Sequence, residues 1–251
     1  MFTNFKAKKS LGQNFLINSG ILNKIVSAAE INPNDVVLEI GPGKGTLTKL
    51  LADKAKKVIT IEKDSRLISP LKEFSKDFSN IEILENDILK FNPANCSLLT
   101  AHYKIVANIP YYITSHLLKI IFEKWPKPKL IILTVQKEVA KRIIAKPPDM
   151  NLLALSVQLY SEPKIISYVS KGSFRPIPKV DSAIIKLTPH PSIDTESVKK
   201  VLLLAKKAFA GKRKQLKNTV ELDLLIKSRI KPESRPQELS LTDWLKIVSE
   251  V

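Results

Sequence analysis

A row of glycines between residues 39 and 46 is the first part of this sequence that could approach a ligand. Gly41, Gly43 and Gly45 follow an apolar, β-branched run and precede a stretch with helical spacing. Glycines at a strand-to-helix turn let the backbone bend sharply and come close to a bound molecule. The spacing is not a dinucleotide fingerprint, because Thr46 replaces the last glycine or alanine, and it is not a P-loop. Taken alone, the turn also fits a purely structural role.

Acidic residues follow the next two strand-like runs. Glu62 ends the run Val58–Ile61, and Asp87 comes shortly after Ile81–Leu84. A carboxylate at the end of the second strand of such a sheet can accept hydrogen bonds from both ribose hydroxyls, and Asp87 could accept one from an adenine amino group. Either acid alone could be a solvated loop residue. Because all three features follow successive strands and share one edge of the sheet, together they predict an adenosine pocket.

A fourth run ends in Asn108-Ile109-Pro110-Tyr111. A side-chain amide oxygen, a backbone carbonyl beside a proline and an aromatic ring suit an amino group on a planar base. Acceptors on the two amine hydrogens favour a tetrahedral nitrogen with an available lone pair, while the ring stacks on the base. The alternative is a structural turn that caps the strand.

The elements that must position these residues alternate along the chain. We expect strands at 36–40, 58–61, 81–84, 103–107 and 130–135 and helices at about 20–30 (N-cap Ser19), 46–55, 64–76, 116–124 and 137–145. This alternation is typical of βαβ units and predicts an α/β fold with a parallel sheet. Two further strand-like runs, 164–169 and 182–187, could close the sheet as a hairpin. Beyond Pro189 only helical stretches follow, so we expect domains at 1–188 and 189–251.

Charge provides the first indication of a partner. The chain has 251 residues with 41 Lys plus Arg against 24 Asp plus Glu, a net charge of +17. This excess favours nucleic acid or an anionic membrane surface, although a solvated lysine-rich surface would give the same composition. Residues 199–217 hold eight basic residues and no acidic one, which favours phosphate contact. The eight are Lys199, Lys200, Lys206, Lys207, Lys212, Arg213, Lys214 and Lys217.

Composition also excludes several classes of protein. A single cysteine, Cys96, excludes an internal disulfide framework, and three His leave little for a metal site. No apolar run approaches the length of a membrane span, and the N-terminus lacks the apolar core of a secretory signal. We therefore expect a cytoplasmic protein with no bound metal and no membrane association.

The motifs together resemble the small-subunit ribosomal RNA adenine N6,N6-dimethyltransferase family, which depends on S-adenosylmethionine. The resemblance runs nearly end to end, and its opening, its Asn-Ile-Pro-Tyr turn and its Phe-Arg-Pro-x-Pro-Lys-Val-Asp-Ser segment are highly specific in combination. The segments that carry it are Lys9–Leu16, Glu39–Gly45, Glu62, Asp87, Asn108–Tyr111, Gln136–Ala140, Phe174–Ala183, Ala208–Lys214 and Glu238–Leu241.

The resemblance implies a Rossmann-like class I methyltransferase sheet with a small C-terminal helical domain. It implies roles for individual residues in binding S-adenosylmethionine, in holding a flipped adenine and in contacting RNA. The cofactor set is Asn14, Leu16, Gly41, Gly43, Glu62, Asp87 and Asn108, the catalytic set is Asn108, Pro110, Tyr111 and Phe174, and the RNA-binding set is Lys207, Lys212, Arg213 and Lys214. Tyr111 and Phe174 would sandwich the extruded base.

The implied reaction transfers methyl groups to N6 of two adjacent adenines near the 3′ end of small-subunit (16S) RNA, with a role in small-subunit biogenesis. The partner would be the immature small subunit, and the protein would act as a monomer. Two alternatives stay open. One is a large-subunit RNA methyltransferase of the macrolide-resistance type, and the other is an RNA-binding assembly factor without catalysis.

Overall fold

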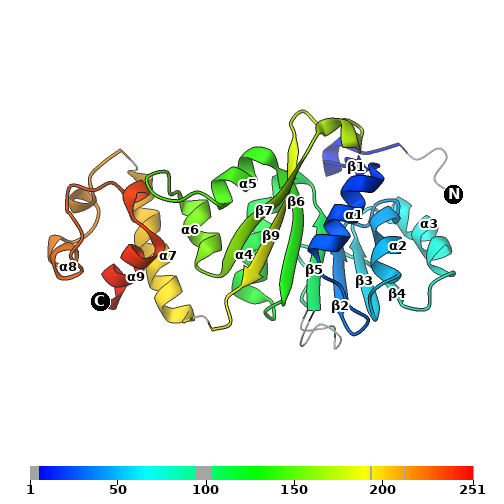
Figure 1. Ribbon diagram of the computed structural model, residues 1–251, viewed down its shortest axis with the longest axis horizontal. Coiled ribbons are helices and arrows are strands. Elements are labelled where there is room, and N and C mark those ends of the chain that lie inside the picture. Colours follow the sequence, from blue (N-terminus) through cyan, green and yellow to red (C-terminus); the bar gives the residue numbers. More distant parts are fainter. Residues whose placement is uncertain (1–5, 94–95, 97–102, 193, 212, 251) are drawn as a thin grey trace. The chain divides into compact units, whose positions relative to one another are not determined.

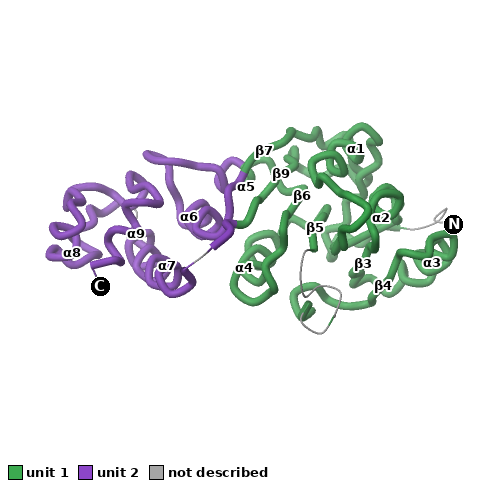
Figure 2. The backbone as a smooth tube through the Cα atoms, turned by 60° about the horizontal axis from the view of Figure 1, so that its bottom comes forward, with its two compact units in different colours: residues 1–140, 164–189 green, residues 141–163, 190–251 purple. Residues whose placement is uncertain are grey.

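The computed structural model describes residues 6–93, 96, 103–192, 194–211 and 213–250. Contacts between Cα atoms divide the chain into two compact units (Figures 1 and 2). The first unit contains residues 1–140 and 164–189, and the second contains 141–163 and 190–251. The chain enters the second unit for the second time after Pro189, one residue from the expected boundary at 188/189. Residues 141–163, which were expected within the first domain, belong to the same unit as the C-terminal residues.

The centre of the first unit is a seven-stranded sheet with the order β4-β3-β2-β5-β6-β9-β7. The first five of these strands run parallel, and β9 pairs antiparallel with β6. Their bounds are β2 Val36–Ile40, β3 Lys57–Glu62, β4 Ile81–Glu85, β5 Tyr103–Asn108, β6 Leu130–Gln136, β7 Ser161–Val169 and β9 Ser182–Pro189. The prediction of an α/β fold with a parallel sheet is confirmed, including the two strands that extend it.

Helices join these strands in the first unit. Their bounds are α1 Ser19–Ala28, α2 Thr46–Ala52, α3 Ser65–Ser75, α4 Thr114–Lys124 and α5 Lys137–Ile143, the last of which crosses into the second unit. Helices α1 and α2 cover one face of the sheet, where Ile25 and Leu51 pack in one core with Val37, Val58 and Val106 of three neighbouring strands.

The helix expected at 20–30 is present, but its predicted cap was wrong. Asn18, not Ser19, is the N-cap of α1, and its side-chain oxygen accepts a hydrogen bond from the backbone N–H of Ile21. Both residue types are good N-caps. A sequence that places them side by side therefore does not decide which one adopts the extended backbone that capping requires.

Two further elements had not been expected. Strands β1 (Phe15–Leu16) and β8 (Phe174–Arg175) form a separate two-stranded antiparallel sheet. In the second unit, helix α6 (Leu152–Gln158) begins after its N-cap Asn151. Both strands of the small sheet are only two residues long, which is too short for a periodic signal in the sequence.

The rest of the second unit is helical. It contains α7 (Thr195–Ala210), α8 (Leu222–Lys227) and α9 (Leu241–Ser249). Helix α7 buries an apolar stripe made of Val198, Val201, Leu202, Ala205 and Ala208. No helix in the described part of the chain is long and apolar enough to cross a membrane.

One carboxyl group lies inside the sheet of the first unit. Glu39, in β2, is 1% exposed, and its Oε2 has no hydrogen-bond partner among the described residues. Burial, and to a smaller extent the nearby charge of Glu62, raises the pKa of Glu39 to about 8. The folded protein therefore holds the Glu39 proton more tightly than the unfolded chain does, so stability from this group is complete at low pH and is lost as the pH rises toward 8.

We predict that Glu39→Gln removes this pH dependence, because glutamine resembles the protonated acid in shape and cannot ionise. From about pH 5 to about pH 8 the variant should gain stability relative to the natural chain, by up to about 1.4 kcal/mol per pH unit. Urea unfolding at several pH values measures the difference. Glu73→Gln, at an exposed position, serves as the control. If the free energy of unfolding of Glu39→Gln changes with pH in parallel with that of the natural chain, the raised pKa of Glu39 is contradicted.

Candidate active site

A cavity lies at the carboxyl ends of the parallel strands, within the first unit. The loops after β2, β3, β4 and β5 line it, together with residues 11–15 of the N-terminal segment. Predicted site residues that line it are Asn14, Gly41, Gly43, Glu62, Asp87, Asn108, Pro110 and Tyr111. The structure thus brings together residues that are almost a hundred positions apart in the chain, as the common edge of a parallel sheet requires.

The glycine turn after β2 needs its glycines. Gly41 and Gly43 have φ angles of 70° and 57°, a left-handed conformation that side chains other than glycine rarely adopt. A Cβ on Gly43 would lie 2.9 Å from the Phe15 ring, which packs against the turn from the N-terminal segment. The glycines therefore permit both the bend and the close approach of a second wall of the cavity.

Glu62 ends β3 and is 7% exposed. Its Oε1 accepts a hydrogen bond of 2.8 Å from the Asp64 N–H, and its Oε2 accepts a longer one of 3.4 Å from the Gly43 N–H. Burial raises the pKa of Glu62, while these backbone N–H groups act against that rise. The carboxyl group is thus held in a fixed orientation, with lone pairs left that can accept from a vicinal diol.

Asp87 follows β4 and is a charged acceptor. Lys63 donates a hydrogen bond of 2.8 Å to its Oδ2, and the Leu89 N–H donates one of 3.1 Å to its Oδ1. The hydrogen bond from Lys63 is the main cause of the lowered pKa of Asp87. Lys63 and Asp87 both line the cavity, so they present a donor and an acceptor side by side, as recognition of a purine edge requires.

The amide of Asn108 has one orientation. Its Nδ2 donates a hydrogen bond of 3.1 Å to the backbone carbonyl of Asn14. Only the nitrogen of the amide can donate to a carbonyl, so this contact makes Oδ1 the free acceptor of the pair. Asn14 therefore acts on the site through its main chain, while its own side chain donates to the Gly12 carbonyl.

Pro110 and Tyr111 begin the turn that follows β5, and Tyr111 lies in a single 3₁₀ turn, Tyr111–Ile113. The Tyr111 hydroxyl shares a hydrogen bond of 2.6 Å with the Ser182 hydroxyl. Burial raises the pKa of Tyr111 above its ordinary value of about 10, so the phenol stays neutral. The side chain is therefore suited to stacking and not to acid–base chemistry at neutral pH.

Leu16 and Phe174 have a different position. They are partners in the β1–β8 pairing, and both belong to the core that α1 and α2 form with the sheet. Phe174 is 0% exposed. Neither is among the described residues that line the cavity.

Several other residues of the cavity wall had no predicted role, among them Gln13, Lys63 and Tyr112. Gln13 lies inside the opening motif Lys9–Leu16, and Lys63 directly follows Glu62. Their place beside predicted ligands was the available signal. That signal does not show whether a side chain faces the cavity, because adjacent residues at a strand end can point to either side of the sheet.

The predicted RNA-binding residues belong to the second unit. Lys207, Arg213 and Lys214 are exposed, and Lys212 lies outside the described residues. Lys207 is on α7, whose apolar stripe is buried. The basic side chains are thus on the solvent side of an amphipathic helix and on the turn that follows it.

The donors and acceptors of the cavity fit S-adenosylmethionine. A fixed, buried carboxylate suits the ribose hydroxyls, and the glycine turn leaves room for the chain of the ligand. We predict that Glu62→Ala weakens binding of S-adenosylmethionine by about 1.5–3 kcal/mol, the range for hydrogen bonds to a charged group.

Isothermal titration calorimetry measures this loss, and thermal unfolding controls for folding. The Glu82→Ala variant, half-buried on the neighbouring strand β4 and not part of the cavity lining, provides the comparison. If the Glu62→Ala protein binds S-adenosylmethionine as tightly as the natural chain does, the assignment of Glu62 to the ribose is contradicted.

Known proteins resemble this chain over nearly its whole length. A family model described as ribosomal RNA adenine dimethylase matches residues 4–251. A protein named ribosomal RNA small subunit methyltransferase A, from Dehalococcoides mccartyi, is 43% identical over 98% of this chain and 88% of its own length. A protein of the same name from Mycoplasmopsis synoviae is 44% identical over 96% of this chain and 91% of its own length.

Solved structures agree with these sequence relatives. A dimethyladenosine transferase from Plasmodium falciparum matches with a TM-score of 0.84 and 33% identity, covering 94% of this chain and 96% of its own. The 23S rRNA methyltransferase ErmE matches with a TM-score of 0.76 and 27% identity, covering 94% and 98%. The sheet order and these neighbours identify the class I methyltransferase fold, and the chain belongs to the ribosomal RNA adenine dimethylase family, whose methyl donor is S-adenosylmethionine.

Proposed function

We propose that this protein transfers methyl groups from S-adenosylmethionine to N6 of two adjacent adenines near the 3′ end of small-subunit ribosomal RNA. The observation that carries the proposal is the fixed amide of Asn108. It lines the same cavity as Glu62 and Asp87, and its Nδ2 is held by the Asn14 carbonyl. One cavity thus combines acceptors for an adenosine with an acceptor for an exocyclic amine.

The chemistry requires orientation more than acid–base catalysis. When bound, S-adenosylmethionine supplies a methyl group already activated by the positive sulfonium. The Asn108 Oδ1 and the backbone carbonyl of Ile109 accept from the hydrogens of the target amine, which makes its lone pair available. The Tyr111 ring stacks on the base, and the walls of the cavity exclude water, so that the nitrogen and the methyl group meet in line.

Phe174 has a smaller part in this scheme. Its side chain is buried in the core, so stacking on the second face of the adenine requires that the ring become exposed. Leu16, in the same core, would act by holding the backbone of the N-terminal segment beside the ligand. Tyr111 therefore carries the stacking proposal.

The second unit supplies affinity for RNA. We assign phosphate contacts to Lys207, Lys212, Arg213 and Lys214 within the domain 189–251. The partner is the immature small subunit, on which the protein acts as a monomer in the cytoplasm. Relatives that are 43% and 44% identical bear the small-subunit name, whereas the large-subunit enzyme ErmE is 27% identical.

An assay with purified substrates tests the function. Unmethylated small subunits and large-subunit RNA are incubated separately with the protein and radiolabelled S-adenosylmethionine. Transfer to the small subunit alone supports the proposal. Transfer to large-subunit RNA would favour the macrolide-resistance type, and cofactor binding by calorimetry without transfer to either RNA would favour a non-catalytic assembly factor.

The central prediction concerns Asn108. Asn108→Ala removes the acceptor for the amine and should sharply lower the rate of single-turnover transfer at saturating cofactor, where product release cannot mask the chemical step. RNA binding should persist. Near-normal transfer to unmethylated small subunits would show that the Asn-Ile-Pro-Tyr turn is structural.

Variants of Tyr111 form a matched pair for the stacking role. Tyr111→Phe keeps the ring and loses only the hydrogen bond to Ser182, so it should retain most of the transfer rate. Tyr111→Ala should lose the stacking energy, about 1–3 kcal/mol for a base on an aromatic ring. Equal activities of the two variants would contradict stacking.

The basic cluster should govern the salt dependence of RNA binding. Replacing Lys207, Lys212, Arg213 and Lys214 with Gln should lower affinity for RNA and reduce the slope of log affinity against log salt by about 0.7–0.9 per lost phosphate contact. Cofactor affinity should not change. As the control, Gln at the exposed Lys49, Lys54, Lys72 and Lys124 of the first unit removes an equal charge. Equal slopes for both sets would show that the cluster is an ordinary solvated surface without phosphate contacts of its own.

A further inference from the structure

Asp64 is a buried carboxylate with an unusual number of partners. Its side chain is 1% exposed. It caps α3 by accepting from the Arg66 N–H at 3.3 Å, and the Arg66 guanidinium donates two more hydrogen bonds, from Nε at 2.9 Å and from Nη2 at 2.6 Å. The hydrogen bond from Arg66 is the main reason that the pKa of Asp64 falls to about 2. The group is therefore charged at neutral pH.

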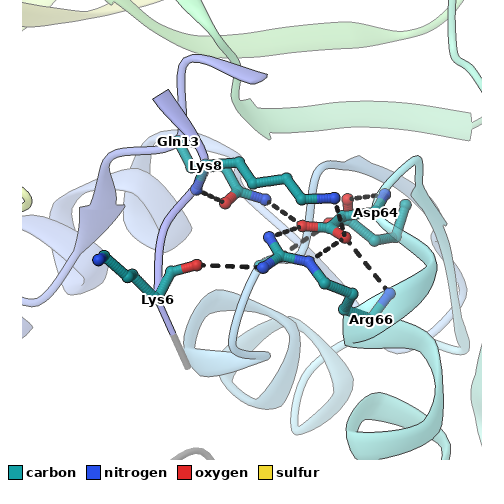
Figure 3. Close-up of polar contacts among 7 residues, drawn as sticks. Lys6, Lys8, Gln13, Asp64 and Arg66 are labelled. Atoms are coloured by element: carbon teal, nitrogen blue, oxygen red, sulfur yellow. Dashed lines mark hydrogen bonds and ion pairs between the residues drawn. The ribbon is translucent and has the colours of Figure 1, made fainter. Parts of the chain in front are cut away.

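One partner of Asp64 comes from the N-terminal segment. The Gln13 Nε2 donates a hydrogen bond of 2.8 Å to the Asp64 Oδ2, and the Gln13 Oε1 accepts one of 2.7 Å from the Lys8 N–H. The Arg66 Nη1 donates to the Lys6 carbonyl at 3.3 Å, and the Lys8 Nζ lies 4.0 Å from Asp64. Figure 3 shows these side chains converging on the carboxylate. Residues 6–13 are thus tied to the start of α3.

These contacts join two parts of the cavity wall, the loop after β3 and the N-terminal segment. On one side, the Asp64 N–H donates to Glu62, the proposed ligand of the ribose. On the other side, the residue after Gln13 is Asn14, whose carbonyl accepts from the Asn108 Nδ2. Glu62 is therefore linked to the Asn108 amide by the hydrogen bonds of Asp64, the peptide bond from Gln13 to Asn14 and the hydrogen bond at the Asn14 carbonyl.

Asn108 depends on this arrangement for its orientation. If the Asn14 carbonyl moves, nothing else described in the structure fixes which end of the Asn108 amide is the acceptor. A flipped amide would present Nδ2, a donor, to the hydrogens of the target amine. The same movement would displace residues 11–15, which form a wall of the cavity.

We propose that Asp64 is a positioning residue that, by holding Gln13, fixes the N-terminal wall of the cavity and the orientation of the Asn108 amide. This inference rests on the proposed function. The competing explanation is that Asp64 only caps α3 and pairs with Arg66, which would affect stability but not the geometry of the site.

A reciprocal exchange separates the two explanations. Asp64→Asn keeps Oδ1 for the cap and the Arg66 Nε, but turns an NH₂ group toward two donors, the Gln13 NH₂ and the Arg66 Nη2. Gln13→Glu faces one carboxylate with another. In the double variant, the amide introduced at position 64 can donate to the carboxylate introduced at position 13, which restores the hydrogen bond with its direction reversed. Glu73→Gln, in the exposed pair with Lys76 on the same helix, removes a charge without touching the site.

Single-turnover transfer at saturating S-adenosylmethionine should fall about tenfold to a hundredfold in each single variant, since a misplacement of about 1 Å can cost about 10²-fold. The double variant should recover much of this loss, and Glu73→Gln should behave as the natural protein. Thermal unfolding monitors the cap. A double variant no faster than the single ones, or natural rates in both single variants, would overturn the proposal.

Hydrogen–deuterium exchange of residues 6–16 gives a readout that does not need the substrate. Exchange there should be faster in both single variants and should return toward natural rates in the double variant. Unchanged exchange in the single variants would overturn the proposal that Asp64 holds Gln13. If the natural protein methylates neither RNA while exchange follows this pattern, the proposed function fails and the proposal that Asp64 holds Gln13 stands.

Discussion

The alignment of the parallel strands is the constraint on which the site depends. Ile40 at the end of β2 lies opposite Ile61 of β3 on one side and Ala107 of β5 on the other. The residues that follow these positions therefore leave the sheet at the same edge. A shift of register by one residue would turn every side chain of a strand to the other face, which would remove Glu62 from the Gly43 N–H and Asn108 from the Asn14 carbonyl. The apolar packing on both faces of the sheet opposes such a shift, because Val37 and Val58 on one face and Leu38 and Ile59 on the other are all fully buried and would have to exchange places.

The N-terminal segment completes what the sheet begins. Parallel strands can present acceptors along one edge, but an edge is open to solvent. Phe15 packs on the glycine turn, the Asn14 carbonyl holds Asn108, and β1 pairs with β8. The main cost of ordering such a segment is conformational entropy. Hydrogen bonds to the charged Asp64–Arg66 pair and burial of Leu16 in the core offset that cost, so chemistry at the edge and order in the segment depend on each other.

We assign chemistry and affinity for RNA to different parts of the chain. The cavity of the first unit combines carboxylates, an amide and a neutral phenol, and we assign its acidic groups to the ligand. The exposed lysines of α7 belong to the second unit and lie opposite the apolar stripe that anchors that helix. Phosphate contacts add affinity without reading sequence. In the proposed scheme, the cavity therefore selects adenine, because its geometry can discriminate between bases.

Much of this was readable from the sequence. The β-branched runs, the glycine turn and the acids at strand ends predicted the α/β sheet, and they predicted that Gly41, Glu62 and Asp87 would meet at one edge. The resemblance implied that Asn108 would join them. These are local signals, because period and turn chemistry act over a few residues. The cap of α1, helix α6 and the β1–β8 pair were not predicted, because adjacent capping residues and two-residue strands carry too little pattern. Only the tertiary structure decided that Phe174 lies in the core, that Asn108 points its Nδ2 at Asn14, and that Asp64 reaches Gln13. Each of these depends on contacts between residues far apart in the chain, whose direction no local spacing determines.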